Sequence, residues 1–364
     1  MKKKNKELDF SNQLISVGID VHKRNWAVTI QIAGQQVKNF SMDPNPEKLI
    51  KHLQTNYPGG IYQSVYEAGF CGYWIDRQLQ AQGIKNIIVN PADVPTSNKE
   101  KTRKTDTIDS RKLARELSSE NLTGIYIPSE DEEAERILSR LRIQLTKDQT
   151  RVKNRIKSLL DFLGVHLPED IELKHWSGGF ISYLQKLEFK YYVVKQTLEQ
   201  LIIELSNLRK QLPQTAQMTE VLKLIRKSVK QNEKTQKIVG HLQTVPGVGF
   251  VTAVTLYTEI MNIKRFSRFD ELSSYVGLAP STHSSGEKER VTGMSQRQNI
   301  HLRSILIESA WIAVRKDPAM TMVFGNLIKR MKKQEAIIRI AKKLLSRIMH
   351  VWTNEEDYVL AVVE

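Results

Sequence analysis

Two apolar runs near the start of the chain, LISVGIDV at 14–21 and WAVTIQI at 26–32, decide the fold of its first third. Both runs are rich in β-branched side chains, and the polar HKRN at 22–25 separates them, so they predict two neighbouring strands. The run at 35–40, which follows a glycine turn, predicts a third strand. We expect these three strands to pair antiparallel.

The sequence downstream alternates between helical and strand periodicity. Apolar spacing predicts helices at 45–52 and 73–82, and strands at 61–67 and 84–90. Three antiparallel strands followed by β-α units predict an α/β domain with a mixed sheet, over residues 13–125. The lysine-rich residues 1–12 predict a basic tail, because they lack the apolar core and the cleavage site of a signal peptide.

From about Glu130 the sequence becomes charged and helical over long stretches. Apolar residues then alternate steps of three and four, as in the heptad seam of a coiled coil, until Pro213. This seam is compatible with a helical hairpin inside one chain and with an arm that pairs two copies. We expect a coiled-coil region over 126–240, a mostly α-helical domain over 241–350 and a tail over 351–364. The seam residues are Leu184, Leu187, Tyr191, Val194, Leu198, Leu201, Leu205, Leu208 and Leu212.

The charge balance favours a polyanionic partner. Among 364 residues, 55 lysines and arginines stand against 40 aspartates and glutamates, which gives a net charge of +15. Cations that neutralise phosphates release counterions, so such a surplus is typical of nucleic-acid binding. The sequence has no apolar run of the length that spans a bilayer. The single cysteine, Cys71, excludes an internal disulfide and a cysteine-cluster zinc site, and fits a reducing cytoplasm.

Four carboxylates stand where the predicted elements would bring them together. Asp20 and Glu67 each end an apolar strand, and strand ends present functional groups at the rim of a sheet. Asp106 and Asp109 are three residues apart in KTDTID, which places them on one face of a helix. Converging carboxylates repel one another unless a cation neutralises them, and oxygen ligands without histidine or cysteine select Mg²⁺ or Mn²⁺. Two such ions, about 4 Å apart, can stabilise the attacking and leaving oxygens of a phosphoryl displacement.

Each of these residues also has a simpler interpretation. An aspartate after a strand is most often a turn or helix cap, and Asp106 could be the N-cap of the helix that it precedes. Glu67 is harder to explain in this way, because a buried carboxylate needs a partner. Basic residues precede Asp106 and would lie where a nucleic-acid backbone approaches, although a charge run is more commonly a solvated loop. They are Lys99, Lys101, Arg103 and Lys104.

The C-terminal third contains two glycine-marked segments. VPGVG at 245–249 resembles the turn of a helix-hairpin-helix element, in which backbone N–H groups near Gly247 and Gly249 would bind a phosphate; a plain turn between packed helices needs the same glycines. Serines at 281–285 follow the GLAP turn, and read alone they are turn formers, because a serine hydroxyl needs a base or metal to become a nucleophile. Arg297 and Arg303 could bind phosphate or face solvent.

Taken in order, several of these segments resemble the DEDD-type transposases of bacterial insertion sequences. They are VGID at 17–20, YEA at 66–68, KTDTID at 104–109, VPGVG at 245–249, GLAP at 277–280 and Ser285-Gly286. The resemblance covers nearly the whole chain and implies an RNase H-like (RuvC-like) domain, a coiled coil and a C-terminal transposase domain. The family's usual small, threonine-containing stretch after the glutamate is AGFCG here (68–72), which bears on local packing only.

The resemblance also implies how such a protein would work. Asp20, Glu67, Asp106 and Asp109 would bind Mg²⁺, and Ser285 would form a covalent phosphoserine link to DNA, with Ser284 as the neighbouring candidate. Donor and target DNA would be selected by a non-coding bridge RNA encoded in the same element. The active form would be a homo-oligomer, up to a tetramer, in the cytoplasm and associated with the nucleoid.

Two other functions use the same features. A junction-resolving nuclease would employ the same carboxylates with water as nucleophile, and would form no covalent protein–DNA species. A non-catalytic scaffold would bind nucleic acid through its basic surface and would tolerate the loss of Asp106. The four carboxylates argue against the scaffold, because carboxylates without a cation hinder phosphate binding.

Overall fold

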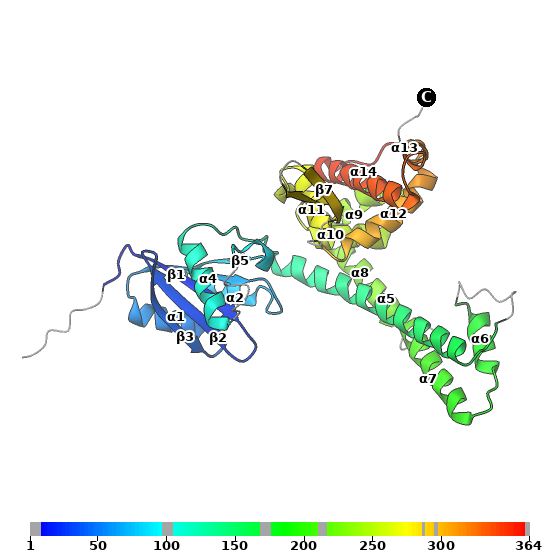
Figure 1. Ribbon diagram of the computed structural model, residues 1–364, viewed down its shortest axis with the longest axis horizontal. Helices are drawn as coiled ribbons and strands as arrows, with labels where there is room; N and C mark the ends of the chain where they lie inside the picture. Colours follow the sequence, from blue (N-terminus) through cyan, green and yellow to red (C-terminus); the bar gives the residue numbers. More distant parts are fainter. Residues whose placement is uncertain are drawn as a thin grey trace, which may run out of the picture. The chain divides into compact units, whose positions relative to one another are not determined.

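The computed structural model describes residues 9–96, 105–167, 176–209, 217–285, 288–294 and 298–360. The chain divides into two compact units, Met1–Ile127 and Pro128–Glu364 (Figure 1). The first unit is a mixed α/β domain and the second is mostly helical, as the sequence predicted. Within these described stretches, no helix combines the length and the apolar character needed to cross a bilayer.

The first unit is built on a five-stranded sheet in the order β3-β2-β1-β4-β5. β1 pairs antiparallel with β2, and β2 with β3, whereas β1–β4 and β4–β5 are parallel. The predicted mixed sheet is therefore confirmed, and its order is compatible with an RNase H-like fold. The strands are β1 (Leu14–Val21), β2 (Trp26–Ile32), β3 (Gln35–Met42), β4 (Ile61–Glu67) and β5 (Lys85–Val89).

Alternation along the strands gives the sheet two different faces. Ile15, Val17 and Ile19 of β1 are fully buried in a core that includes Leu49 of helix α1 (Pro46–Asn56) and Leu79 of α2 (Trp74–Ala81). The intervening residues of β1 face the opposite side, which helix α4 (Asp106–Ser118) covers over β1 and β2 (Figure 1). A short 3₁₀ turn, η1 (Pro91–Asp93), follows β5.

Helix α4 lies unusually close to the sheet because β1 carries Gly18 at the contact. A Cβ at Gly18 would lie 2.2 Å from the carbonyl oxygen of Ser110 and 2.4 Å from the amide nitrogen of Ala114, both in α4. Beside this contact, the Ser110 hydroxyl lies 2.9 Å from the Thr29 hydroxyl, and Asn39 donates to Thr29 over 2.6 Å. These bonds satisfy the buried hydroxyls and fix the helix over β1 and β2.

In its described residues, the second unit consists of helices and one β-hairpin. The long helix α5 (Glu130–Phe162) contacts α7, α8 and α10. The hairpin is formed by β6 (Pro280–Ser285) and β7 (Lys288–Met294), and the sequence did not predict it. The other helices are α6 (Gly178–Lys186), α7 (Tyr192–Arg209), α8 (Gln217–Gln231), α9 (Glu233–Thr244), α10 (Phe250–Ile260), the 3₁₀ turn η2 (Ile263–Arg265), α11 (Phe269–Val276), α12 (Leu302–Lys316), α13 (Pro318–Ile328) and α14 (Lys333–Asn354).

The predicted heptad seam does not lie on one helix. Helix α6 ends at Lys186 and α7 begins at Tyr192, so the seam is broken in its first third. The ammonium of Lys195 donates to the carbonyl oxygens of Gln185 and Leu187, which satisfies the end of α6. Leu198 and Leu205 of α7 are fully buried in a core to which residues of α5 also contribute. This packing within one chain favours the helical hairpin over an arm that pairs two copies. Leu212 and Pro213 lie outside the described residues.

Candidate metal centre

The ends of β1 and β4 bring two of the predicted carboxylates to one edge of the sheet. The parallel register pairs Ile19 with Tyr66, so Asp20 and Glu67 are the next residues of neighbouring strands. Side chains alternate between faces, and Ile19 and Tyr66 both lie in the core on the α1 side. Asp20 and Glu67 therefore belong to the face that α4 covers, and both are partly buried.

Helix α4 supplies the other two carboxylates from its first turn. Its N-cap is Thr105, whose hydroxyl accepts from the amide of Ile108 over 3.3 Å. Asp106 is therefore the first residue of the helix, and the interpretation of Asp106 as a cap is wrong. Free N–H groups at a helix start favour nearby anions, which makes this turn a suitable place for Asp106 and Asp109.

His22 joins Asp20 to Asp106. Its Nε2 lies 3.1 Å from Oδ2 of Asp20 and 3.5 Å from Oδ1 of Asp106. One ligand atom from each of the three residues lies within 4.8 Å of the others, which is a spacing that one metal ion can bridge. Burial raises the pKa of Asp20; His22 opposes this, and the charges of Asp109 and Asp106 add to it. Burial is therefore the main obstacle to ionisation of Asp20, and a cation bound beside it would favour the charged carboxylate.

Lys112 joins the remaining two carboxylates. Its ammonium lies 3.5 Å from Oε1 of Glu67 and 3.3 Å from Oδ1 of Asp109, and only 7% of its side chain is exposed. Asp109 and Lys112 are three residues apart on α4 and so share a face of the helix. The structure thus brings the four carboxylates together in two pairs, Asp20 and Asp106 at His22, and Glu67 and Asp109 at Lys112. Only the first pair, with His22, has the spacing that one metal ion can bridge, and the charge of Asp109 acts on Asp20 from the second pair.

The chemistry of this group fits a divalent metal ion. Glu67 and Asp109 share one ammonium, and Asp20 and Asp106 share one imidazole, so the carboxylates outnumber their basic partners. Carboxylate oxygens are the preferred ligands of Mg²⁺ and Mn²⁺. The imidazole of His22 adds a nitrogen donor that the sequence analysis did not include. Nitrogen donors suit Mn²⁺ better than Mg²⁺, so this ligand set leaves room for both ions.

Sequence reasoning missed His22 and Lys112 as members of the site. His22 lies two residues after Asp20, in a polar segment that predicts only a turn, and Lys112 is one of many charged residues in a helical run. The spacing of Asp106, Asp109 and Lys112 in steps of three was a usable signal, because it puts all three on one helix face.

The glycine turn at 245–249 is explained in part by packing. Gly247 has φ +90°, and a Cβ there would lie 2.3 Å from the carbonyl oxygen of Ser309 in α12. Gly249 is the N-cap of α10, and a Cβ there would meet open space. Gly247 is therefore required by close contact with a helix, while Gly249 leaves the start of α10 accessible.

The remaining predicted contacts are only partly described. Ser285 ends β6 opposite Lys288, and the structure describes its backbone but not its side chain. Arg303 packs against the end of α11, where a Cβ on Gly277 would lie 2.8 Å from its guanidinium, and burial lowers the pKa of Arg303. Five predicted cations lie outside the described residues: Lys99, Lys101, Arg103, Lys104 and Arg297.

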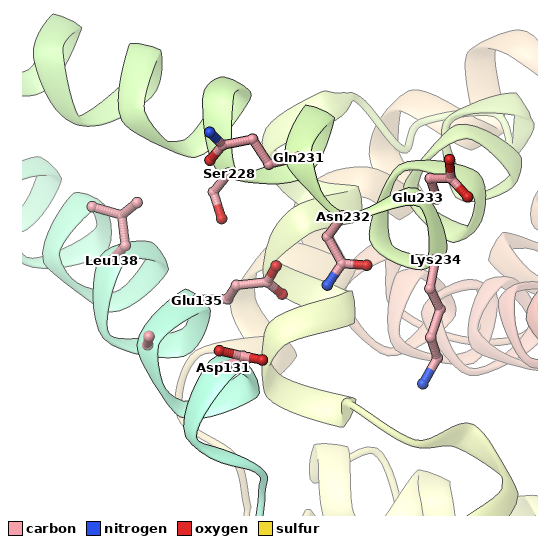
Figure 2. A pocket seen from close by; sticks show the side chains of 9 residues that line it. Asp131, Glu135, Leu138, Ser228, Gln231, Asn232, Glu233 and Lys234 are labelled. Carbon is pink, nitrogen blue, oxygen red and sulfur yellow. The ribbon is translucent and has the colours of Figure 1, made fainter.

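A second acidic group lies in an open pocket of the helical unit. Figure 2 shows Asp131 and Glu135 of α5 beside Asn232 and Lys234, where α8 passes into α9. The Thr235 hydroxyl lies 3.3 Å from Oε1 of Glu135, and burial raises the pKa of Glu135. A carboxyl group that accepts from a neighbouring hydroxyl already has a structural partner, so this pocket is a weaker candidate than the centre on β1, β4 and α4.

Comparison with known proteins places these features in a family. Residues 17–164 match the DEDD transposases of IS110-type elements, and residues 239–324 match the family described as Transposase IS116/IS110/IS902. The first match contains all four carboxylates, and the second contains the β6–β7 hairpin.

Curated relatives agree along most of the chain. The chain is 30% identical to the putative transposase y4rJ of Sinorhizobium fredii, over 77% of this chain and 74% of that protein. It is 27% identical to the transposase for insertion sequence element IS1111A of Coxiella burnetii, over 80% and 77%. It is 31% identical to the transposase for IS1533 of Leptospira borgpetersenii, over 69% and 70%. This chain belongs to the IS116/IS110/IS902 family of transposases.

Proposed function

We propose that the chain cleaves and exchanges DNA strands at the boundaries of an insertion sequence, with Mg²⁺ or Mn²⁺ held by Asp20, Glu67, Asp106 and Asp109. The observation that carries the proposal is the convergence of these carboxylates from β1, β4 and α4 on one face of the sheet. Lys112 compensates Glu67 and Asp109, and His22 contacts Asp20 and Asp106, but the four carboxylates still outnumber these two partners, and this excess of negative charge favours a cation.

A bound divalent ion would supply Lewis-acid stabilisation of negative charge on phosphate oxygens. The residues of the chain would then orient the scissile phosphate and exclude bulk water. The hydroxyl oxygen of Ser285 would attack the phosphorus atom: a bond from Ser285 to phosphorus forms, the bond to the 3′ oxygen breaks, and a 3′ hydroxyl is left for the exchange. The resemblance supports this role for Ser285, and it supports pairing of the carboxylates of one subunit with the serine of another.

The same proposal assigns target choice to a non-coding bridge RNA. The net charge of +15 is compatible with binding both DNA and RNA. A structured non-coding segment in the DNA that flanks the coding sequence would support this assignment. Under this proposal, the full reaction contains that RNA together with donor and target DNA.

The test compares Asp106→Asn and Ser285→Ala with the parent chain in that reaction. We expect Asp106→Asn to abolish cleavage. We expect Ser285→Ala to abolish the covalent protein–DNA adduct, trapped under denaturing conditions, while Ser284→Ala retains it. Cleavage without any adduct in the parent chain would favour the junction-resolving nuclease with water as nucleophile. Full recombination by Asp106→Asn would refute the metal centre and favour the scaffold.

A further inference from the structure

Lys112 is a buried ammonium inside a site that attracts metal cations. Only 7% of its side chain is exposed, and its nitrogen lies 3.5 Å from Glu67 and 3.3 Å from Asp109. Removing an ammonium from water is costly unless opposite charges surround it. The two carboxylates provide that compensation, so Lys112 occupies the position that a second metal ion would otherwise take.

The centre therefore has two unlike halves. The open half consists of Asp20, His22 and Asp106, whose ligand atoms lie within 4.8 Å of one another. His22 and Asp106 are 45% and 56% exposed, so an ion can reach this half from solvent. The closed half consists of Glu67 and Asp109 with Lys112 between them.

The charges of the two halves favour a metal ion in only one of them. A histidine that ligates a metal does so as the neutral imidazole, so the two carboxylates of the open half would balance the charge of one divalent cation. The closed half already contains one ammonium, and a divalent ion there would have to displace it or lie against it. A divalent ion in contact with the Lys112 ammonium would be repelled strongly, because the site is partly buried and water screens the charges poorly.

We propose that Lys112 is a resident cation of the metal centre: without nucleic acid the chain binds one divalent ion, at Asp20, His22 and Asp106, and Lys112 keeps a second ion from Glu67 and Asp109. The inference rests on the metal centre of the proposed function and makes Lys112 a positioning residue. It also gives Lys112 the task of holding Glu67 and Asp109 together before DNA arrives.

The test is the stoichiometry of Mn²⁺ binding to the full chain without nucleic acid, measured by titration calorimetry and by the electron paramagnetic resonance of free Mn²⁺. We expect one ion per chain for the parent and for Lys112→Arg, which keeps the cation. We expect two ions for Lys112→Met, or a second site at least tenfold tighter than in the parent. The matched control is Arg111→Met, which removes one charge from an exposed neighbour on α4 and should leave one ion.

A second comparison keeps the inference testable if Lys112→Met does not fold. Asp106→Asn should weaken the binding of the single ion by tenfold or more, because Asp106 is a ligand of the open half. Glu67→Gln should weaken it less than Asp106→Asn does, because without nucleic acid Glu67 contacts Lys112. Two ions bound to the parent, an unchanged Lys112→Met, or equal losses in Asp106→Asn and Glu67→Gln would overturn the inference and leave the proposed function intact. A parent chain that binds no Mn²⁺ would instead refute the metal centre itself.

Discussion

Replacing Gly18 with alanine should disturb the metal centre from beneath, although Gly18 carries no functional group. The new Cβ would lie 2.2 Å from the Ser110 carbonyl oxygen and 2.4 Å from the Ala114 nitrogen, whereas ordinary contact begins at 3.4 Å. Both obstructing atoms belong to the backbone of α4, so no side-chain rotation can relieve the overlap. The helix must move away from β1 by roughly 1 Å, which exceeds the tolerance of about 0.5 Å that a preorganised site allows.

The magnitude follows from that displacement. Overpacking of this kind costs about 1–3 kcal/mol of the free energy of unfolding, which corresponds to a fall in Tm of roughly 5–10 °C for a domain of this size. Movement of α4 also carries Asp106 and Asp109 away from Asp20, so we expect Mn²⁺ to bind at least tenfold more weakly.

Thermal unfolding and Mn²⁺ titration of the full chain measure both effects. Gly240→Ala is the matched control, because Gly240 lies within helix α9 and a Cβ there meets nothing within 4 Å. Alanine in a helix interior should leave metal binding unchanged and stabilise by up to about 1 kcal/mol. A Gly18→Ala chain with the Tm and Mn²⁺ affinity of the parent would show that α4 does not rest on Gly18, and the argument would fail.

Two further changes probe the supports of each unit. Thr105→Ala removes the side-chain cap of α4, so we expect the free energy of unfolding to fall by about 1 kcal/mol and Mn²⁺ to bind more weakly. Thr105→Ser keeps the hydroxyl and should preserve both stability and binding. Identical metal affinity in the two variants would count against the cap as a support of the site. Glu259→Gln in the helical unit removes the charge of a carboxylate with no exposed area that accepts from Arg140 over 2.7 and 2.9 Å. Because Arg140 is 42% exposed and can regain water, the expected loss at neutral pH is about 2–3 kcal/mol, at the lower end for a broken buried pair.

The same residue gives a pH dependence with a definite sign. Burial acts to raise the pKa of Glu259, but its bonds to Arg140 and Asn299 outweigh it and hold that pKa below the ordinary 4.5. Its contribution to stability is therefore present above pH 4.5 and is lost as the pH falls through the lower folded value. Denaturant unfolding should show the parent and Glu259→Gln converging below pH 4.5; a constant difference would exclude this carboxylate as the cause.

The sheet could be predicted because its signals are local. The strands at 14–21, 26–32 and 61–67 coincide with β1, β2 and β4, since their apolar runs alternate with residues that suit a covered face. The gathering of the carboxylates could also be anticipated, because strand ends and helix steps of three are readable in sequence. What each carboxylate does stays a prediction.

Other features depend on contacts between distant segments. The sequence from Leu184 to Leu208 keeps heptad spacing across the connection between α6 and α7, so the spacing alone does not reveal the break. The contacts of Lys195 with the end of α6 depend on the folded chain and cannot be predicted from the sequence. The β6–β7 hairpin lies in a serine-rich stretch whose residues favour turns as much as strands.

The segment KTDTIDSRKLA, residues 104–114, shows how several requirements can fall on about two and a half turns of one helix. Asp106 contacts His22, and Asp109 contacts Lys112, which also reaches Glu67 of β4. On the side of the helix that contacts the sheet, the backbone of Ser110 and Ala114 meets Gly18 of β1. The charged residues and the packing residues lie on the same helix. A substitution that shifts the packing side must therefore also move the charged side chains. If the carboxylates bind a metal ion as proposed, we expect a substitution in the core that contacts α4 to weaken that binding although it changes no ligand.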